Sequence, residues 1–206
     1  MGADIHLYLE YREKGGEWNL HPRHTEDKYE KDYINDIQAA GRWYKLFGIL
    51  AEVRGDGCIY QPRGFPSDMS KRLKSHTDKF LEHTPHWLTI KEFKHCLDKV
   101  EKIWKKEIKQ EYKHHQELLS DGNMTQQEFD RYWKDDPKEK KKPKWENIFN
   151  YGNDTYPNFY NHYEPPGYFD IIPYIEKLED EMKAEYILID QEPPEYEFRF
   201  VFYFDS

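Results

Sequence analysis

The chain has only two cysteines, Cys58 and Cys96, among its 206 residues. Two cysteines do not make a disulfide framework, so we expect a reducing, cytoplasmic setting. No run of 18 apolar residues occurs, which argues against a membrane-spanning helix. The first residues show no basic segment followed by a long apolar run, so we predict no signal peptide.

Positive charge is also scarce. The chain carries 31 Lys and Arg residues against 40 Asp and Glu residues, a formal net charge of −9. An acidic chain is repelled by long nucleic acids and by anionic membrane surfaces, so we expect neither as a partner. The usual signatures of phosphate and metal sites are missing as well: there is no Walker or dinucleotide glycine motif, no HExxH and no paired CxxC.

Aromatic residues are what the chain has in abundance. They make up 17% of the sequence, whereas hydrophobic residues of all kinds reach only 37%. We therefore expect a core built largely from rings, with further rings available for a planar ligand or a protein contact. The aromatic stretch at residues 145–168 is typical of an ordered, ring-packed loop, in which Tyr160 is a candidate for stacking on a ligand.

The two ends of the chain predict its architecture. Residues 3–12 alternate between apolar and polar side chains, and residues 196–205 place phenylalanine at every second position. Pairing both ends in one antiparallel sheet, with helices packed on one face, gives an α+β fold. The length fits a single domain over residues 1–206. A helical hairpin, a lysine-rich loop and the aromatic loop form an insert at about residues 90–168.

The polar face of the first strand holds the candidate catalytic residues. Asp4 and His6 stand about 7 Å apart along it, and Tyr8, next on the same side, is a candidate ligand contact. The pair could bind a divalent metal ion as a cofactor. Alternatively, His6 could be a general base oriented by Asp4. Strand pairing would bring Asp205 or Arg199 close to them. The alternative is an ordinary solvated face, since antiparallel sheets commonly have one wet side.

Three arginines near the middle of the chain are candidates for binding an anion. Residues 43–54 have the apolar spacing of a helix, which we expect to end at Gly55 with Arg54 in its last turn. Arg63 follows on a loop stiffened by two prolines, where a guanidinium loses little entropy on binding. Arg42 precedes the helix. The alternative for Arg54 is a positive charge that is favourable near the C-terminus of a helix. The alternative for Arg63 is a position in a solvent-facing loop.

Two histidines with two residues between them form a candidate metal pair. We interpret residues 83–87 as a loop that brings His83 and His86 within reach of each other. Trp87, which follows directly, is a further ring for ligand binding. Because the chain has ten histidines, coincidence is the alternative explanation of this spacing.

Helices account for most of the remaining sequence. Thr89 and Glu92 have the spacing of a capping box, and a helical apolar stripe follows to about residue 119. A second capping box at residues 125–128 predicts a return helix and hence an αα-hairpin. A helix after Asp170 and a short strand at residues 186–190 precede the last strand.

Several short motifs resemble those of a group of small uncharacterised proteins encoded by phages and some bacterial genomes. The resemblance covers both ends of the chain and residues 41–92. It rests on M-G-x-D-I-H at residues 1–6, R-x-Y-x-L-F at 42–47, P-R-G-x-P at 62–66, W-L-T at 87–89 and F-x-F-D at 202–205. It implies a phage accessory protein in the cytosol of a host cell, of a kind that often counters host defence by removing nucleotide signals.

Three functions are compatible with these observations. The first is a binding protein that sequesters a small phosphate-bearing, nucleotide-like molecule through its arginines and rings. The second is a metal- or histidine-dependent hydrolase or phosphodiesterase of such a nucleotide. The third is a protein-directed inhibitor without a small ligand. Whether the protein is an enzyme, and whether it forms a homo-oligomer, stay open at this point.

Overall fold

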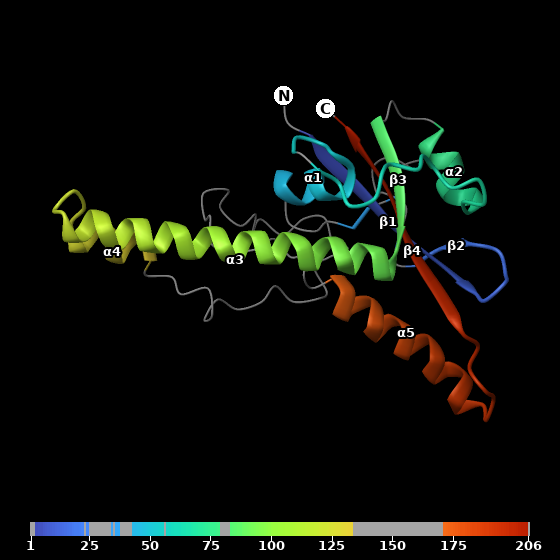
Figure 1. Ribbon diagram of the computed structural model, residues 1–206. Helices are drawn as coiled ribbons and strands as arrows, with labels where there is room; N and C mark the ends of the chain where they lie inside the picture. Colours follow the sequence, from blue (N-terminus) through green and yellow to red (C-terminus); the bar gives the residue numbers. More distant parts are fainter. Residues whose placement is uncertain are drawn as a thin grey trace.

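The computed structural model describes residues 3–22, 24, 34, 36–37, 43–55, 57–78, 83–133 and 171–205. These residues form one sheet and a set of helices around it (Figure 1). The elements are, in chain order, β1 (Asp4–Glu13), β2 (Asn19–Leu20), α1 (Tyr44–Ala51), α2 (Lys71–Thr77), β3 (His83–Thr89), α3 (Ile90–Ser120), α4 (Gln126–Trp133), α5 (Ile171–Leu188) and β4 (Tyr196–Asp205).

The sheet is antiparallel, and its strand order is β2-β1-β4-β3. The first and last strands lie side by side at its centre, with Asp4 opposite Asp205 and Glu13 opposite Tyr196. Both ends of the described chain therefore meet at the same end of the sheet (Figure 1). This confirms the predicted α+β fold with both terminal strands in one antiparallel sheet.

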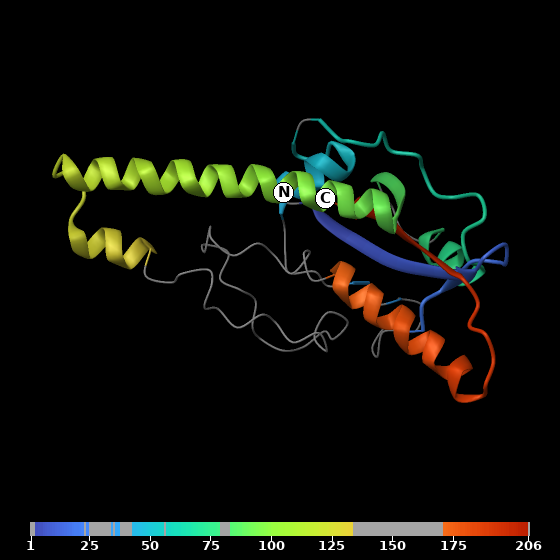
Figure 2. The ribbon, with the colours of Figure 1, turned by 60° about the horizontal axis from the view of Figure 1, so that its bottom comes forward.

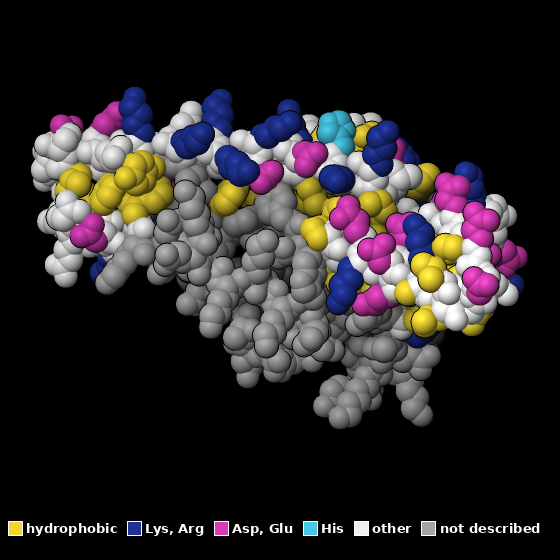
Figure 3. Space-filling model, turned by 90° about the horizontal axis from the view of Figure 1, so that it is seen from below, with side chains coloured by type: hydrophobic (Ala, Val, Ile, Leu, Met, Phe, Trp, Pro, Cys, Tyr) yellow, Lys and Arg dark blue, Asp and Glu magenta, His cyan; other side chains and the backbone are white. Residues whose placement is uncertain are grey.

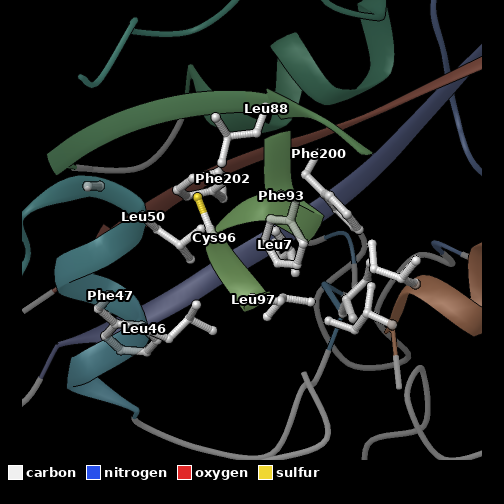
Figure 4. Close-up of a cluster of buried hydrophobic side chains, with 14 of the residues drawn as sticks. Leu7, Leu46, Phe47, Leu50, Leu88, Phe93, Cys96, Leu97, Phe200 and Phe202 are labelled. Atoms are coloured by element: carbon white, nitrogen blue, oxygen red, sulfur yellow. The ribbon is translucent and has the colours of Figure 1, made fainter. Parts of the chain in front are cut away.

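One face of the sheet carries the main hydrophobic core. Helices α1, α3 and α5 pack on this face and contribute buried side chains to a single cluster with β1 and β4 (Figure 4). The ring of Phe93, in the first turn of α3, lies 4.3 Å from that of Phe200 on β4. Edge and tilted ring contacts of this kind add to the burial of apolar area, as the aromatic composition predicts.

The opposite face is also covered, so the expectation of a wet face is wrong. Tyr8 and Val201 on this face are completely buried, and they pack with Leu73 of α2 in a second cluster. Polar side chains are buried beside them, among them Glu10 and Arg199. Alternation along a strand tells which residues share a face, but it does not tell what later parts of the chain lie over that face.

Helix α3 begins as predicted and runs well beyond the sheet. Thr89 accepts a hydrogen bond from the Glu92 backbone N–H, and the Glu92 side chain accepts one from the Thr89 backbone N–H, which confirms the capping box. The far half of α3 projects from the sheet, and α4 folds back along it (Figure 2). Trp133 of α4 packs at 4.8 Å against Tyr112 of α3 and closes the predicted hairpin. Within the described part of the chain, no helix has the length and apolar character needed to cross a bilayer.

Helix α1 is shorter than the predicted helix at residues 43–54. It ends at Ala51, and Glu52 takes the left-handed conformation, with φ of 59°. Gly55 was expected to supply that conformation, but it does not have a positive φ. Its role is a close approach: a Cβ built on Gly48 would lie 2.8 Å from the Cα of Gly55. The pair lets the chain after α1 fold back against the helix.

Replacing Gly48 by alanine is expected to destabilise the protein by about 1–3 kcal/mol, because the new methyl group meets backbone that cannot turn away. The same substitution in an unobstructed helix would stabilise it by roughly 1 kcal/mol. Urea unfolding of the wild-type protein and the G48A variant measures the difference. Stabilisation by G48A would contradict the close approach, whereas a loss of stability in a separate G55A variant would support it from the other side of the contact.

Two further segments differ from their predictions. Residues 83–87 are not a loop but belong to β3, an edge strand that tolerates Pro85 because its outer side needs no hydrogen-bond partner. The ladder is irregular between His83 and His86. Residues 186–190 are not a strand, since α5 continues to Leu188 and a turn follows. The local sequence pattern of each segment fits more than one type of secondary structure. For residues 83–87, pairing with the edge of β4 decided in favour of a strand.

Candidate functional site

The end of the sheet where the two chain termini meet carries the candidate site. His6 lies on β1 directly opposite Tyr203 of β4, and Asp4 lies opposite Asp205. Side chains at these alternate positions point to the polar face of the sheet. The His6 ring stacks on the Tyr203 ring with 4.8 Å between centroids. Strand pairing therefore places an imidazole and two carboxylates together, as expected for Asp4, His6 and Asp205.

His6 is held between two carboxylates. Its Nδ1 atom lies 2.9 Å from Oδ2 of Asp36, and its Nε2 atom lies 3.2 Å from Oδ2 of Asp205. The side chain of Asp36 is 4% exposed, whereas that of Asp205 is 49% exposed and that of His6 is 17% exposed. One ring nitrogen is thus fixed from the protein interior, and the other faces a carboxylate at the surface.

The two carboxylates favour the doubly protonated form of the His6 ring. Burial by itself lowers the pKa of this imidazole, but the hydrogen bonds and negative charges of Asp36 and then of Asp205 outweigh it, so the pKa is raised above 6.5. An ionised carboxylate can only accept a hydrogen bond, so both ring nitrogens donate in this state. Asp4 does not orient the ring; its backbone N–H donates to Oδ1 of Asp205 at 3.3 Å.

A buried polar network lies behind this site on the same face. The hydroxyl oxygens of Tyr203 and Tyr8 are 3.4 Å apart, and the Tyr8 hydroxyl lies 2.9 Å from Nε2 of His76 on α2. The ring of His6 thus rests on a tyrosine that is itself hydrogen-bonded into the interior. Networks of this type fix the orientation of their members, because each lost hydrogen bond would leave a buried polar atom without a partner.

Metal binding by His83 and His86 finds no support in the arrangement of the described residues. Among these residues, no group of three or more His, Cys, Asp or Glu side chains is placed to hold a metal ion. Nδ1 of His86 accepts hydrogen bonds from the backbone N–H groups of Arg63 and Trp87. Burial and the nearby charge of Arg63 lower the pKa of His86 to about 4. His86 is therefore a neutral side chain that ties a loop to β3, while His83 contacts Thr84.

Arg63 does not present a free guanidinium. It forms a two-point contact with the carboxylate of Glu92, with Nη1 3.0 Å from Oε2 and Nη2 2.5 Å from Oε1. The hydrogen bonds and charge of Glu92 raise the pKa of Arg63. Because Glu92 also caps α3, this ion pair joins the proline loop to the start of the helix. A phosphate could bind here only in place of Glu92.

The remaining candidates that the structure describes do not gather at one site. Arg54 is exposed and lies over the ring of Tyr44, at 5.9 Å, away from the contacts of Arg63. Tyr8 is completely buried, so it does not meet a ligand directly. Trp87 is half-buried against the guanidinium of Arg63, at 4.8 Å. Arg42 and Tyr160 lie outside the described residues, and so does the whole stretch at residues 145–168. The described candidates therefore make no common phosphate site.

Asp36 and His76 are the site residues that sequence reasoning missed. Asp36 lies in a polar stretch, but Ile34 and Ile37 on either side of it are buried, and the Ile37 backbone N–H donates to the Leu7 carbonyl at 2.7 Å. This isolated apolar pair was the signal that the segment returns to the sheet. His76 had no comparable signal beyond its place on the same short helix as Leu73.

Comparison of the chain with protein-family models, curated proteins and solved structures gives no match. Any function must therefore follow from the arrangement of the described residues. Its central element is an imidazole fixed by a buried carboxylate at Nδ1, with its Nε2 directed toward a partly exposed carboxylate.

Proposed function

We propose that the protein is a hydrolase that acts on a small nucleotide-like molecule by general acid–base chemistry at His6. The observation that carries this proposal is the hydrogen bond between Nδ1 of His6 and the buried carboxylate of Asp36. A carboxylate in that position fixes the ring orientation and its tautomer, and leaves Nε2 as the nitrogen that exchanges a proton with a substrate.

Movement of the Asp205 side chain away from Nε2 of His6 would open this site to a substrate. The Asp205 carboxylate is the present partner of Nε2, yet it is 49% exposed and lies near the end of β4. If Asp205 turned toward solvent, it would give up its contact with Nε2 and the hydrogen bond from the Asp4 backbone N–H. A substrate hydroxyl or a water molecule would then take its place at Nε2. The neutral imidazole would accept the proton of the attacking water, and the imidazolium would return it to the leaving group.

Sequestration without turnover is the second candidate function, and it uses the same site. Its supporting observation is that both ring nitrogens of His6 face carboxylates, which favours the positively charged form of the ring. An imidazolium can hold a phosphate oxygen at Nε2 in place of Asp205 without any chemical step. In this form the protein would match the first function suggested by the sequence, with His6 rather than Arg63 as the anion contact.

The test is a panel of linear and cyclic nucleotides mixed with the purified protein, followed by mass spectrometry of the filtrate before and after heat denaturation. The phage resemblance is the reason for including cyclic nucleotides. We expect one compound to return cleaved, with turnover lowered by about 10²–10⁴-fold in the H6Q variant. The matched control is H114Q, which changes an exposed histidine on α3. A compound that returns intact identifies the sequestering protein, and a filtrate that loses nothing overturns both proposals in favour of a protein partner.

The pH dependence gives an independent check on His6. Because the base must be unprotonated, kcat/KM should rise with pH through the raised pKa of His6. In the D205N variant this limb should move to lower pH, because a negative charge that stabilises the imidazolium is removed. Proton NMR titration of the His6 ring should show the same shift in the absence of substrate. An unchanged midpoint in both experiments would contradict the role of the carboxylate clamp.

A further inference from the structure

Helix α3 has two contrasting faces. One is apolar and lies in the main core, where Phe93, Cys96, Leu97 and Val100 are buried. At 100° per residue, the side chains within about 70° of the opposite direction are almost all polar, and most are basic. This lysine stripe consists of Lys91, Lys94, Lys99, Lys102, Lys105, Lys106, Lys109 and Lys113.

The lysine stripe is open to solvent along its whole length. All of its members are exposed, and a line of Lys and Arg side chains follows α3 in the space-filling view (Figure 3). Lys105 and Lys113 have carboxylates of their own helix at 2.6 and 3.6 Å. For the other six lysines, no ion pair is found within the described part of the chain. Asp98 and Glu117 are the acidic residues that share this face.

The position of these charges contrasts with the acidity of the whole chain. The net charge is −9, yet α3 alone carries eight lysines against six acidic residues. Several of those acids are directed elsewhere: Glu92 binds Arg63, and Glu107 binds Lys45 of α1. A local positive field of this kind attracts an anionic partner even when the molecule as a whole is negative, within a Debye length of about 10 Å at 0.1 M salt.

We propose that the lysine stripe binds the phosphate backbone of double-stranded nucleic acid. Protein interfaces are depleted in lysine and depend on aromatic and apolar anchors. The exposed aromatic residue at the edge of this face, Tyr112, already packs against Phe129 and Trp133 of α4. A membrane-surface helix would need an exposed apolar face, whereas that of α3 is buried in the core. Contacts from lysine to phosphate need neither anchor nor apolar face, because they act through charge alone.

The shape of the stripe favours a duplex over a single strand. From Lys91 to Lys113 it spans about 33 Å at a rise of 1.5 Å per residue, close to one turn of a duplex at roughly 34 Å. Proteins that bind single strands stack bases on aromatic rings. The rings on this face of α3 already have ring partners: His95 contacts Tyr60, and Tyr112 packs against Trp133. The stripe also carries no Arg or Asn to read base edges, so the contact is with the backbone and does not select a sequence.

Fluorescence anisotropy of a labelled 20-base-pair DNA duplex tests this proposal with the full-length protein. We expect binding with a Kd on the order of 10 μM at 50 mM salt, weakening steeply as salt is added. The K102Q/K106Q/K109Q variant should bind at least tenfold more weakly, and the slope of log K against log salt should become shallower by roughly 2–3. The control variant, K71Q/K74Q/K177Q, loses the same charge from α2 and α5 and should bind within threefold of the wild type. A K102R/K106R/K109R variant should retain binding.

Several results would overturn the proposal. One is no binding of the duplex by the wild-type protein at 50 mM salt, and another is an equal loss in the stripe and control variants. Tighter binding to a 20-nucleotide single strand, or to vesicles that contain phosphatidylserine, would assign the stripe to a different anion. Circular dichroism of each variant shows that α3 is intact, so a loss of binding is not a loss of folding.

Discussion

Replacing Arg199 by methionine is expected to lower the free energy of unfolding by about 3–5 kcal/mol, because it leaves a buried carboxylate without its counter-charge. Glu10 lies directly opposite Arg199 in the sheet and is completely buried. Nε of Arg199 donates to Oε2 of Glu10 at 2.8 Å, and Nη1 donates to Oδ1 of Asp68 at 2.7 Å. The other oxygen of Glu10 accepts the Ser70 backbone N–H at 2.7 Å. The network therefore ties the segment before α2 to the centre of the sheet.

Urea unfolding of the wild-type protein and the R199M variant measures this loss. R12M is the matched control, since Arg12 pairs with Glu197 on the same strands but at a partly exposed position, where an ion pair contributes under about 1 kcal/mol. The double variant E10M/R199M should recover much of the stability, because it buries no charge. A loss below about 1 kcal/mol in R199M would show that Glu10 finds another partner or water, contrary to the interpretation of a closed network.

Replacing Phe93 by alanine is expected to cost about 3–5 kcal/mol, through lost burial and the cavity that remains. Phe93 is completely buried in the first turn of α3 and packs on Phe200 at 4.3 Å. Only the first part of α3 lies on the sheet, so its attachment depends on few side chains. Hydrogen exchange should show loss of protection along α3 in the F93A variant before the central strands β1 and β4 are affected.

The matched control for F93A is F129A in α4. Phe129 is half-buried in the hairpin, where it contacts Tyr112 and Trp133 away from the main core. Its loss should cost clearly less than the loss of Phe93 in urea unfolding. Equal costs would mean that the hairpin and the sheet unfold as one unit with comparable packing, which would contradict the view of α3 as a helix anchored at one end.

Buried ion pairs and hydrogen bonds on the polar face of the sheet support the candidate site at His6. Its buried ion pairs, centred on Arg199, lie near one end, and the Tyr8–His76 hydrogen bond lies between them and His6. Side chains toward the other end are progressively more exposed, so His6 keeps one ring nitrogen near the surface. A rigid interior behind a partly exposed imidazole is the arrangement that precise proton transfer requires.

The sequence alone was sufficient to predict the pairing of the two chain ends, the α+β class and the start of α3. Strict alternation over ten residues and a complete capping box are local signals that few other structures satisfy. They also predicted that Asp205 or Arg199 would come close to Asp4 and His6, and the strand register places Asp205 there. The length of α3 was predicted too, since its apolar stripe runs to about residue 119 and the helix ends at Ser120.

Tertiary structure alone decided which partners these side chains have. Asp36 contacts His6 from a segment with no regular sequence pattern. Glu92 forms an ion pair with the guanidinium of Arg63, which the sequence predicts as an anion-binding group. The polar face is buried because α2 packs on it. Residues 83–87 form a strand because they pair with the edge of β4. These outcomes depend on contacts between residues far apart in the chain, and local periodicity carries no information about such contacts. The sequence therefore determined the frame of the sheet, and long-range packing determined the chemistry of the groups placed on it.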